Sequence, residues 1–327
     1  MKCLLTAAAA AGWLGIAAAP ALAEEAIDVV ATVGMIGDVA KNVAGDCAEV
    51  TSIMGPGVDP HLYQARAADV RAFETTEIIL YSGYFLEGQL GAVLAKFGER
   101  KPTVALSESS IPEAELIKVQ GAYGVDPHLW MDAGLWSRLA PTIATTLGEL
   151  RPACAEEFAT NAEAYVAQLT ALDAWAREAI GTIPESQRSL VTAHDAFGYY
   201  GRAYGIEVAG LQGLTTQSEA SIADIRATAA LVAETGVPAV FIESTINPRM
   251  VQAVIDAVRQ RGNTVEIGGS LYSDAMGEEG TAGGTYIGMI FANTRTITEA
   301  LGGTVPPLPE ALAGWAEQWG VSMAAAE

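Results

Sequence analysis

Three histidines are the residues of this chain whose positions most clearly indicate chemistry. The sequence contains only three: His61, His128 and His194. The first two occupy the same place in a repeated hexapeptide, GVDPHL, at residues 57–62 and 124–129. A neutral imidazole is a common ligand of zinc and related transition metals. Histidines in such similar settings favour one shared metal site over separate structural roles.

The hexapeptide also predicts local structure. Its aspartate is a good helix N-cap and its proline a good first helical residue, so we expect Asp59 and Asp126 to be caps rather than ligands. His61 and His128 would then lie in the first turn of a helix, where the dipole favours the neutral imidazole that metals require. The helix-compatible stretches that follow are residues 62–73 and 129–150.

His194 ends the apolar run 190–193 and stands where a strand should open into a cleft. A single histidine beside an apolar strand is more often a hydrogen-bonded structural residue than a ligand. That alternative does not explain why all three histidines occupy a strand exit or a helix start. Ligation of one metal ion by the set is therefore the preferred interpretation.

A zinc-like ion needs at least one further donor. Asp274 is the first candidate, because it follows the last predicted strand and precedes the glycine-rich segment 280–286, which would let its loop aim into a cleft and move on release. From the residues alone, an ordinary turn aspartate is an equally good interpretation. Glu243, which ends the apolar run 240–242, is the second candidate, and it could instead orient a histidine.

Short β-rich runs alternate with longer helical patterns, which predicts an α/β fold with parallel sheets and crossover helices. Continuous apolar runs such as 239–242 indicate strands covered by helices on both faces. Four runs fall in each half of the chain: 27–33, 48–53, 77–81 and 103–106, then 189–193, 206–211, 238–242 and 264–268.

Between these two sets, apolar residues at steps of three and four predict one helix over about 153–181. Pro152 before it, and Gly181 with Pro184 after it, are suitable start and stop signals. The apolar face comprises Phe158, Ala162, Tyr165, Leu169, Leu172, Ala176 and Ala179. Such a helix would connect two small lobes stiffly and leave the ligand site in the cleft between them.

The first 23 residues read as a secretory signal with a small-residue cleavage site before Glu24. Cys3 lies upstream of that site, so we expect a free periplasmic protein, with no later apolar run long enough to cross a bilayer. The expected organisation is a signal peptide at 1–23, an N-terminal α/β lobe at 24–150, the connecting helix at 151–183 and a C-terminal α/β lobe at 184–327.

The formal charge of −21 becomes −22 once Lys2 leaves with the leader, which makes nucleic acid an unlikely partner. An acidic surface would attract a cationic ligand, but more often it only confers solubility. Cys47 and Cys154 could pair in an oxidising compartment, but their spacing matches no zinc framework, and we exclude them from the metal site.

Other features carry less chemistry. No phosphate-binding glycine loop, nucleophile elbow or His-Glu-x-x-His motif occurs in the sequence. The aromatic residues near the motifs are expected to pack in the core, with some lining the cleft: Trp130, Trp136, Tyr199, Tyr200 and Tyr272.

Four segments together resemble the metal-specific solute-binding proteins of ABC importers, the TroA/ZnuA/PsaA-like group, over nearly the whole mature chain. They are GVDPHLY at 57–63, DPHLWMD at 126–132, TAHDAFGY at 192–199 and SDAMG at 273–277. The resemblance implies two lobes with parallel four-stranded sheets, joined by one long rigid helix, with a single ion in the interlobe cleft. It also implies the ligand set His61, His128, His194 and Asp274, no enzymatic activity, and delivery of the ion by a monomer to an ABC-importer permease.

In that family a histidine at the third ligand position tends to accompany zinc or mixed specificity, and a glutamate there tends to accompany manganese, so His194 favours zinc. The chain lacks the long histidine- and acid-rich loop of many zinc receptors, and its 273–289 region resembles the zinc/manganese branch, so manganese is the second expectation. The alternatives are a zinc hydrolase or hydratase with three histidine ligands, and a receptor for a metal chelate. For unperturbed histidines, metal affinity should fall as the pH drops through about 6 to 7.

Overall fold

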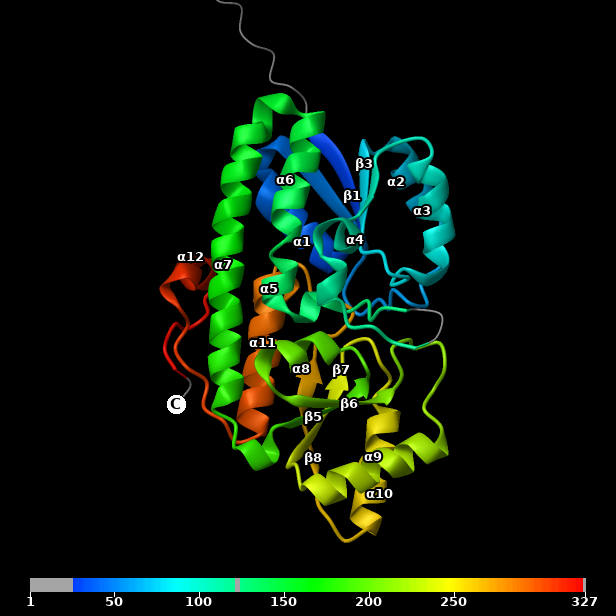
Figure 1. Cartoon of the computed structure of the whole chain (residues 1–327), viewed down its shortest axis with the longest axis vertical. Coiled ribbons are helices and arrows are strands. Elements are labelled where there is room, and N and C mark those ends of the chain that lie inside the picture. The colour runs from blue at the N-terminus through cyan, green and yellow to red at the C-terminus, as the bar shows by residue number, and fades with distance from the viewer. Residues whose placement is uncertain (1–25, 121–123, 326–327) are drawn as a thin grey trace, which may run out of the picture.

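The computed structural model describes residues 26–120 and 124–325, so the expected leader lies outside the described residues. Two α/β lobes are stacked along one long helix, one lobe above the other in Figure 1. The predicted fold class is confirmed, with parallel strands, flanking helices and a connecting helix near the predicted positions.

The N-terminal lobe contains one parallel sheet of strand order β2-β1-β3-β4. Except for the exposed Asp28, the side chains of β1 are buried, because helices cover both faces of the sheet. The strands are β1 (Ile27–Val33), β2 (Ala48–Met54), β3 (Ile78–Tyr81) and β4 (Thr103–Ala105). The helices are α1 (Gly34–Ala44), α2 (Ala67–Thr75), α3 (Gly91–Gly98), α4 (Leu106–Ser110), α5 (Ala133–Trp136) and α6 (Leu139–Leu150).

The C-terminal lobe differs in detail from the single four-stranded sheet that we expected. Its strands form two parallel pairs, β5 with β6 and β7 with β8, and β5 packs beside β7. At that junction the backbone N–H of His194 donates to the side chain of Glu243 instead of a backbone carbonyl. The strands are β5 (Ser189–His194), β6 (Glu207–Gln212), β7 (Ala239–Glu243) and β8 (Glu266–Leu271). The helices are α8 (Gly198–Tyr204), α9 (Ile222–Thr235), α10 (Arg249–Gln260), α11 (Tyr286–Ala300) and α12 (Ala313–Trp319).

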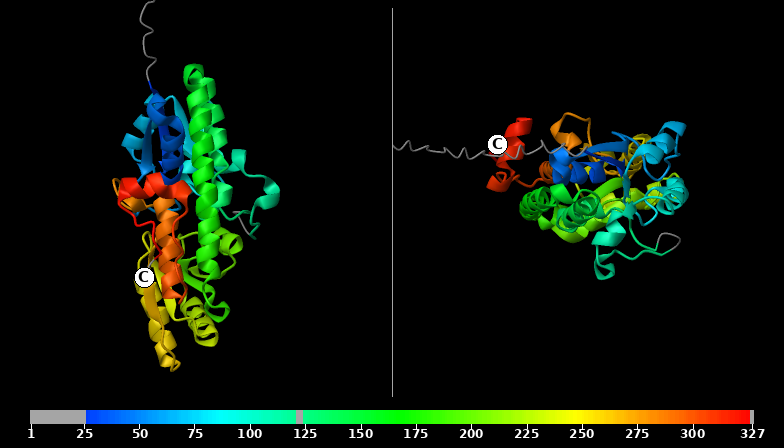
Figure 2. Two further views of the ribbon diagram at one scale, coloured as in Figure 1. Left: turned by 90° about the vertical axis from the view of Figure 1, so that its left-hand side faces the viewer. Right: turned by 90° about the horizontal axis from the view of Figure 1, so that it is seen from above.

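The connecting helix α7 (Ala155–Gly181) has 27 residues and is therefore about 40 Å long. It runs past both lobes and lies against α6, α1 and α11 (Figure 2). All seven residues of its predicted apolar face are buried. Nowhere in the described ranges is a helix both long and apolar enough to cross a bilayer.

The two lobes share a core on the α7 side. One cluster of buried apolar side chains extends from β1 through α7 to α8 and α11. Two tyrosine hydroxyls on α8 also accept backbone N–H groups from the other lobe: Tyr199 from Ile117 at 3.0 Å and Tyr204 from Ala133 at 3.2 Å. These contacts join the two lobes on the α7 side in addition to the helix itself.

A disulfide closes the N-terminal lobe. Cys47 and Cys154, which the sequence left unassigned, are bonded, with their Cα atoms 6.4 Å apart and a sequence separation of 107. The bond joins the end of the α1 region to the short segment that leads into α7.

The double substitution of Cys47→Ser with Cys154→Ser should lower the free energy of unfolding by about 3 to 5 kcal/mol, because the unfolded chain loses a constraint on a long loop. Urea denaturation followed by circular dichroism measures this difference. The parent protein treated with a reductant is the control and should behave like the variant. Equal stability of the oxidised parent and the variant would contradict the expectation.

Candidate metal centre

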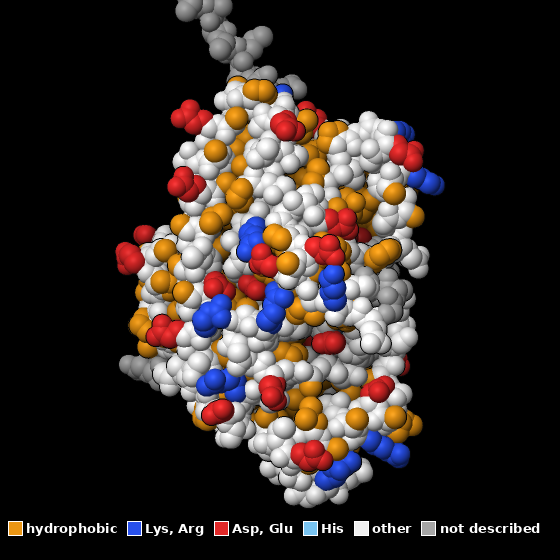
Figure 3. All heavy atoms as spheres, in the orientation of Figure 1, with side chains coloured by type: hydrophobic (Ala, Val, Ile, Leu, Met, Phe, Trp, Pro, Cys, Tyr) orange, Lys and Arg blue, Asp and Glu red, His pale blue; other side chains and the backbone are white. Residues whose placement is uncertain are grey.

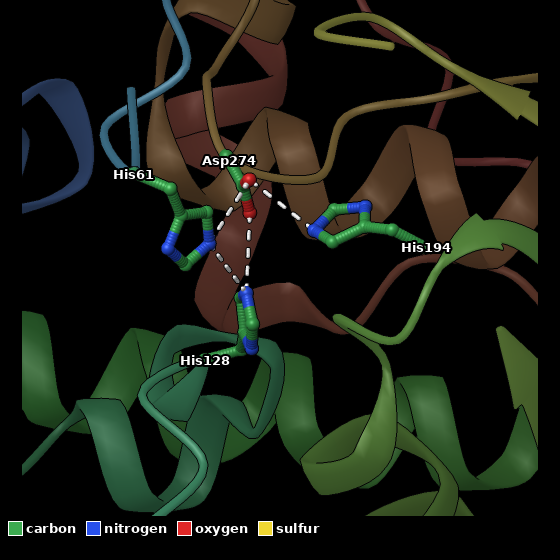
Figure 4. Close-up of side chains that lie close together, drawn as sticks. All are labelled: His61, His128, His194 and Asp274. Atoms are coloured by element: carbon green, nitrogen blue, oxygen red, sulfur yellow. Dashed lines mark hydrogen bonds and ion pairs between the residues drawn. The ribbon is translucent and has the colours of Figure 1, made fainter. Parts of the chain in front are cut away.

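Four side chains from separate segments converge at the interface between the lobes (Figure 4). They are His61 in the turn after β2, His128 before the 3-10 helix η4 (Leu129–Met131), His194 at the end of β5, and Asp274 in the loop after β8. One donor atom from each lies within 4.8 Å of the others, so the group could hold a metal ion. The structure thus brings together all four residues selected from the sequence.

The distances between the donor atoms fit one small cation. His61 Nε2 lies 3.2 Å from His128 Nε2, and His194 Nε2 lies 3.2 Å from Asp274 Oδ2. Asp274 Oδ1 is 3.5 Å from His128 Nε2, and its Oδ2 is 3.6 Å from His61 Nε2. Two donors that bind one tetrahedral zinc ion at about 2.1 Å are about 3.4 Å apart. These four separations are close to that value, and all four residues have a donor atom within 4.8 Å of the others.

The cluster is closed off from solvent. The four residues are at most 1% exposed, and no histidine is visible on the face shown in Figure 3. Neither oxygen of Asp274 accepts a well-directed hydrogen bond within the described part of the chain. A buried carboxylate is costly unless a positive charge or hydrogen-bond donors compensate it. A metal ion or an imidazolium group would supply that charge.

Two further carboxylates orient the imidazoles. Asp126 Oδ1 lies 2.7 Å from His128 Nδ1, and Glu243 Oε2 contacts His194 Nδ1. A carboxylate that accepts the Nδ1–H leaves Nε2 free to face the centre, the usual arrangement for ligating histidines. Glu243 is therefore not part of the converging group and has the orienting role that the sequence left open.

The predicted helical setting of His61 and His128 is wrong. His61 lies in a turn six residues before α2 begins at Ala67, and His128 precedes η4. In each hexapeptide the aspartate Oδ1 accepts the backbone N–H of the histidine two residues later, which closes a local turn instead of capping a helix.

The two hexapeptides, although identical, use their aspartates differently. Asp126 contacts the His128 ring, as described above, whereas Asp59 Oδ2 accepts the hydroxyl of Thr216 from the C-terminal lobe. Neither aspartate belongs to the converging group, as expected from the sequence. Because the two hexapeptides are identical, the sequence does not show that Asp126 orients a histidine ring whereas Asp59 joins the lobes.

Burial and neighbouring charges shift the ionisation of the cluster in opposite directions. Burial lowers the pKa of His61 to about 4. Burial also disfavours the protonated form of His194, but Asp274 and Glu243 outweigh it and raise the pKa of this imidazole well above its ordinary 6.5. Burial alone would raise the pKa of Asp274, yet the surrounding histidines lower it far below its ordinary value. Helix dipoles are not needed to keep His61 neutral.

The loop that carries Asp274 is tightly folded. A Cβ atom on Gly284 would stand 2.2 Å from the carbonyl oxygen of Glu278, and one on Gly288 would stand 1.8 Å from that of Ala282. Such close backbone approaches require glycine. Of the glycines in the expected segment 280–286, Gly284 is therefore required by close packing, whereas a Cβ on Gly280 would meet nothing within 4 Å.

The aromatic residues near the motifs occupy the seam between the lobes. Trp136, Tyr199 and Tyr200 are fully buried, and Tyr272 is partly exposed. Trp130 differs from them because its indole N–H donates to the carbonyl oxygen of Ser273, the residue before Asp274. Nothing in the sequence distinguished Trp130 from a core residue.

Comparisons with known proteins show similarity to proteins that are named for binding zinc or manganese. The profile of the family described as "Zinc-uptake complex component A periplasmic" matches residues 29–300, a range that includes all four converging residues. The zinc-binding protein TroA of Treponema pallidum is 47% identical over 273 residues, which cover 84% of this chain and 88% of that protein. The manganese-binding lipoprotein MntA of Bacillus subtilis is 44% identical over 279 residues, covering 85% and 91%. The solved structure of the T. pallidum periplasmic zinc-binding protein TroA matches with a TM-score of 0.82 at 46% identity, covering 84% of this chain and 99% of that one.

In metal-free protein, the imidazole of His61 should titrate near pH 4, whereas that of His194 should remain protonated well above pH 6.5. NMR spectra of the ring protons across a pH series measure both transitions. Glu243→Gln should lower the pKa of His194, because it removes one of the two carboxylates that raise it. Glu266→Gln, at an exposed position on β8, is the control and should have no effect. Titration of both rings near pH 6.5 would contradict this account.

Proposed function

This chain belongs to the family of the periplasmic component A of zinc-uptake complexes, and from that premise we propose that it captures one divalent transition-metal ion and delivers it to an ABC-importer permease. The observation that carries the proposal is the convergence of four buried donors at spacings suited to one ion. The ligands in this proposal are Nε2 of His61, His128 and His194, with the carboxylate of Asp274.

Zinc is the first candidate for the ion. Three imidazole nitrogens and one carboxylate oxygen form a donor set that tetrahedral zinc prefers. Manganese is the second candidate, because both oxygens of Asp274 face the imidazoles and together would give five donors. One relative is named for zinc and another for manganese, so the relatives do not separate the two ions.

Binding without catalysis fits the closed centre better than hydrolysis does. A zinc hydrolase keeps one metal position open for water and substrate. Here Asp274 stands among the imidazoles, and each of the four residues is at most 1% exposed. A receptor for a metal chelate would need room for organic atoms, whereas the donor atoms of this group all lie within 4.8 Å of one another. Capture of a bare ion remains the function best supported.

Location and assembly follow from the same proposal. The leader expected at 1–23 would send the chain to the periplasm, where an oxidising environment suits the disulfide between Cys47 and Cys154. We expect a monomer that docks on the permease with the ion held between the lobes. The relative from B. subtilis is called a lipoprotein, whereas for this chain we propose a free form, because Cys3 precedes the expected cleavage site.

Binding should be coupled to protons. The raised pKa of His194 means that this ring carries a proton in metal-free protein near neutral pH, and the ion must displace it. His61, with its pKa of about 4, is already neutral there and contributes no such competition. Acid therefore weakens binding mainly through His194, over a range above the 6 to 7 expected for unperturbed rings.

Substituting any proposed ligand should weaken zinc binding by about 100-fold or more, because each supplies a bond that no neighbour replaces. The variants are His61→Ala, His128→Ala, His194→Ala and Asp274→Ala. Competition titration against a fluorescent zinc chelator measures the affinity. Asp69→Asn, a buried carboxylate whose partners are Tyr63 and Arg66, is the control and should bind like the parent. Parent-like binding by two of the histidine variants would show that the site is misassigned.

Parent protein stripped of metal should prefer zinc over manganese at equal concentrations, because three nitrogen donors suit zinc better than the harder manganese ion. Elemental analysis after equilibration with both ions gives the ratio. A clear excess of bound manganese would reverse the assignment of the ion while leaving metal capture intact.

A further inference from the structure

Trp130 is bonded to both ends of the loop that carries Asp274. Its indole N–H donates to the carbonyl oxygen of Ser273 at 2.8 Å, at the start of that loop. Its own carbonyl oxygen accepts the hydroxyl of Tyr286 at 2.7 Å, at the first residue of α11, where the loop ends. Ser273 and Tyr286 are 143 and 156 residues away from Trp130 in the sequence.

The same side chain also lies beside a proposed ligand. The ring of Trp130 meets that of His128 edge to face, with their centroids 5.3 Å apart, and Trp130 is fully buried. One residue therefore connects the segment of His128 to the loop of Asp274 across the seam. A buried hydrogen bond of this kind fixes the position of the backbone that bears the carboxylate.

We propose, building on the proposed function, that Trp130 is a positioning residue that holds Asp274 with both oxygens toward the imidazoles and thereby supports manganese binding beside zinc. Asp274 Oδ1 faces His128 and Oδ2 faces His194, at 3.5 and 3.2 Å. A loop released from Trp130 would keep one oxygen on the ion more easily than two. Three nitrogens and one oxygen satisfy zinc, whereas manganese prefers more oxygen donors.

Trp136 provides a matched comparison for a purely structural role. It is also fully buried, its ring meets that of Trp130 edge to face, and it stacks on Tyr286. Its indole nitrogen has no hydrogen-bond partner in the described part of the chain. Replacing either tryptophan with phenylalanine removes the same atoms, but only at Trp130 does it remove a bond to the Asp274 loop.

The test compares zinc and manganese affinities of Trp130→Phe and Trp136→Phe with those of the parent. Trp130→Phe should lower manganese affinity by about 10-fold or more, the usual effect of removing a group that orients a ligand. The loss of zinc affinity should be several-fold smaller than the loss of manganese affinity. Trp136→Phe should leave the ratio of the two affinities unchanged. Equal losses for both ions in Trp130→Phe, or the same change of ratio in Trp136→Phe, would overturn the inference.

Two further variants keep the test decisive. Tyr286→Phe removes the bond at the other end of the loop and should shift the ratio in the same direction, so it serves if Trp130→Phe does not fold. In an Asp274→Asn background, Trp130→Phe should cause no additional change of ratio, because the group that it positions is already altered. An additional change of the same size would contradict action through Asp274.

A parent protein that binds neither ion would overturn the proposed function itself. This outcome differs from failure of the proposed role of Trp130, in which the parent binds both ions but the ratio of the two affinities does not change in Trp130→Phe.

Discussion

The carboxylate of Asp274 is buried among three imidazole rings, and a charge in that position is costly unless positive charge or hydrogen-bond donors compensate it. The need to neutralise this group links the features of the centre. The surrounding histidines lower the pKa of Asp274, and Asp274 together with Glu243 raises that of His194. The same four residues leave a position between their donor atoms that one cation can occupy. In metal-free protein, a proton on His194 supplies the positive charge beside Asp274 that a metal ion would otherwise supply.

Keeping donors from four distant segments at these distances requires a stiff scaffold. The helix α7 runs past both lobes, and its buried face joins their cores. Tyrosine hydroxyls on α8 bind backbone groups of the other lobe, and Trp130 binds the loop after β8. The glycines of that loop bring its backbone into close contact. Specific hydrogen bonds therefore hold the centre together in addition to the shared core.

Much of the architecture could be predicted from sequence because it depends on local patterns. Short β-rich runs located the strands to within a few residues, and the three-and-four spacing located α7. The three histidines that converge were selected because histidine is rare in this chain and stands at strand exits or in a repeated motif, whereas Asp274 was separated from an ordinary turn aspartate only by the family resemblance. The helical setting of His61 was wrong because an aspartate followed by proline can close a short turn as well as cap a helix. Asp59 differs from Asp126 because its partner, Thr216, is 157 residues away, and Trp130 donates to Ser273, 143 residues away; local patterns do not encode such partners. Glu243 could be proposed but not assigned, because its role depends on packing between β5 and β7.

The disulfide between Cys47 and Cys154 has a topological consequence. It closes a covalent ring that contains both His61 and His128, while His194 and Asp274 lie outside it. A protease that cuts one peptide bond within this ring would leave both pieces joined and both histidines on one covalently connected lobe. A cut within α7, which follows residue 154, would instead leave the lobes held only by noncovalent contacts. Cleavage at these two kinds of position should therefore have different effects on the integrity of the centre.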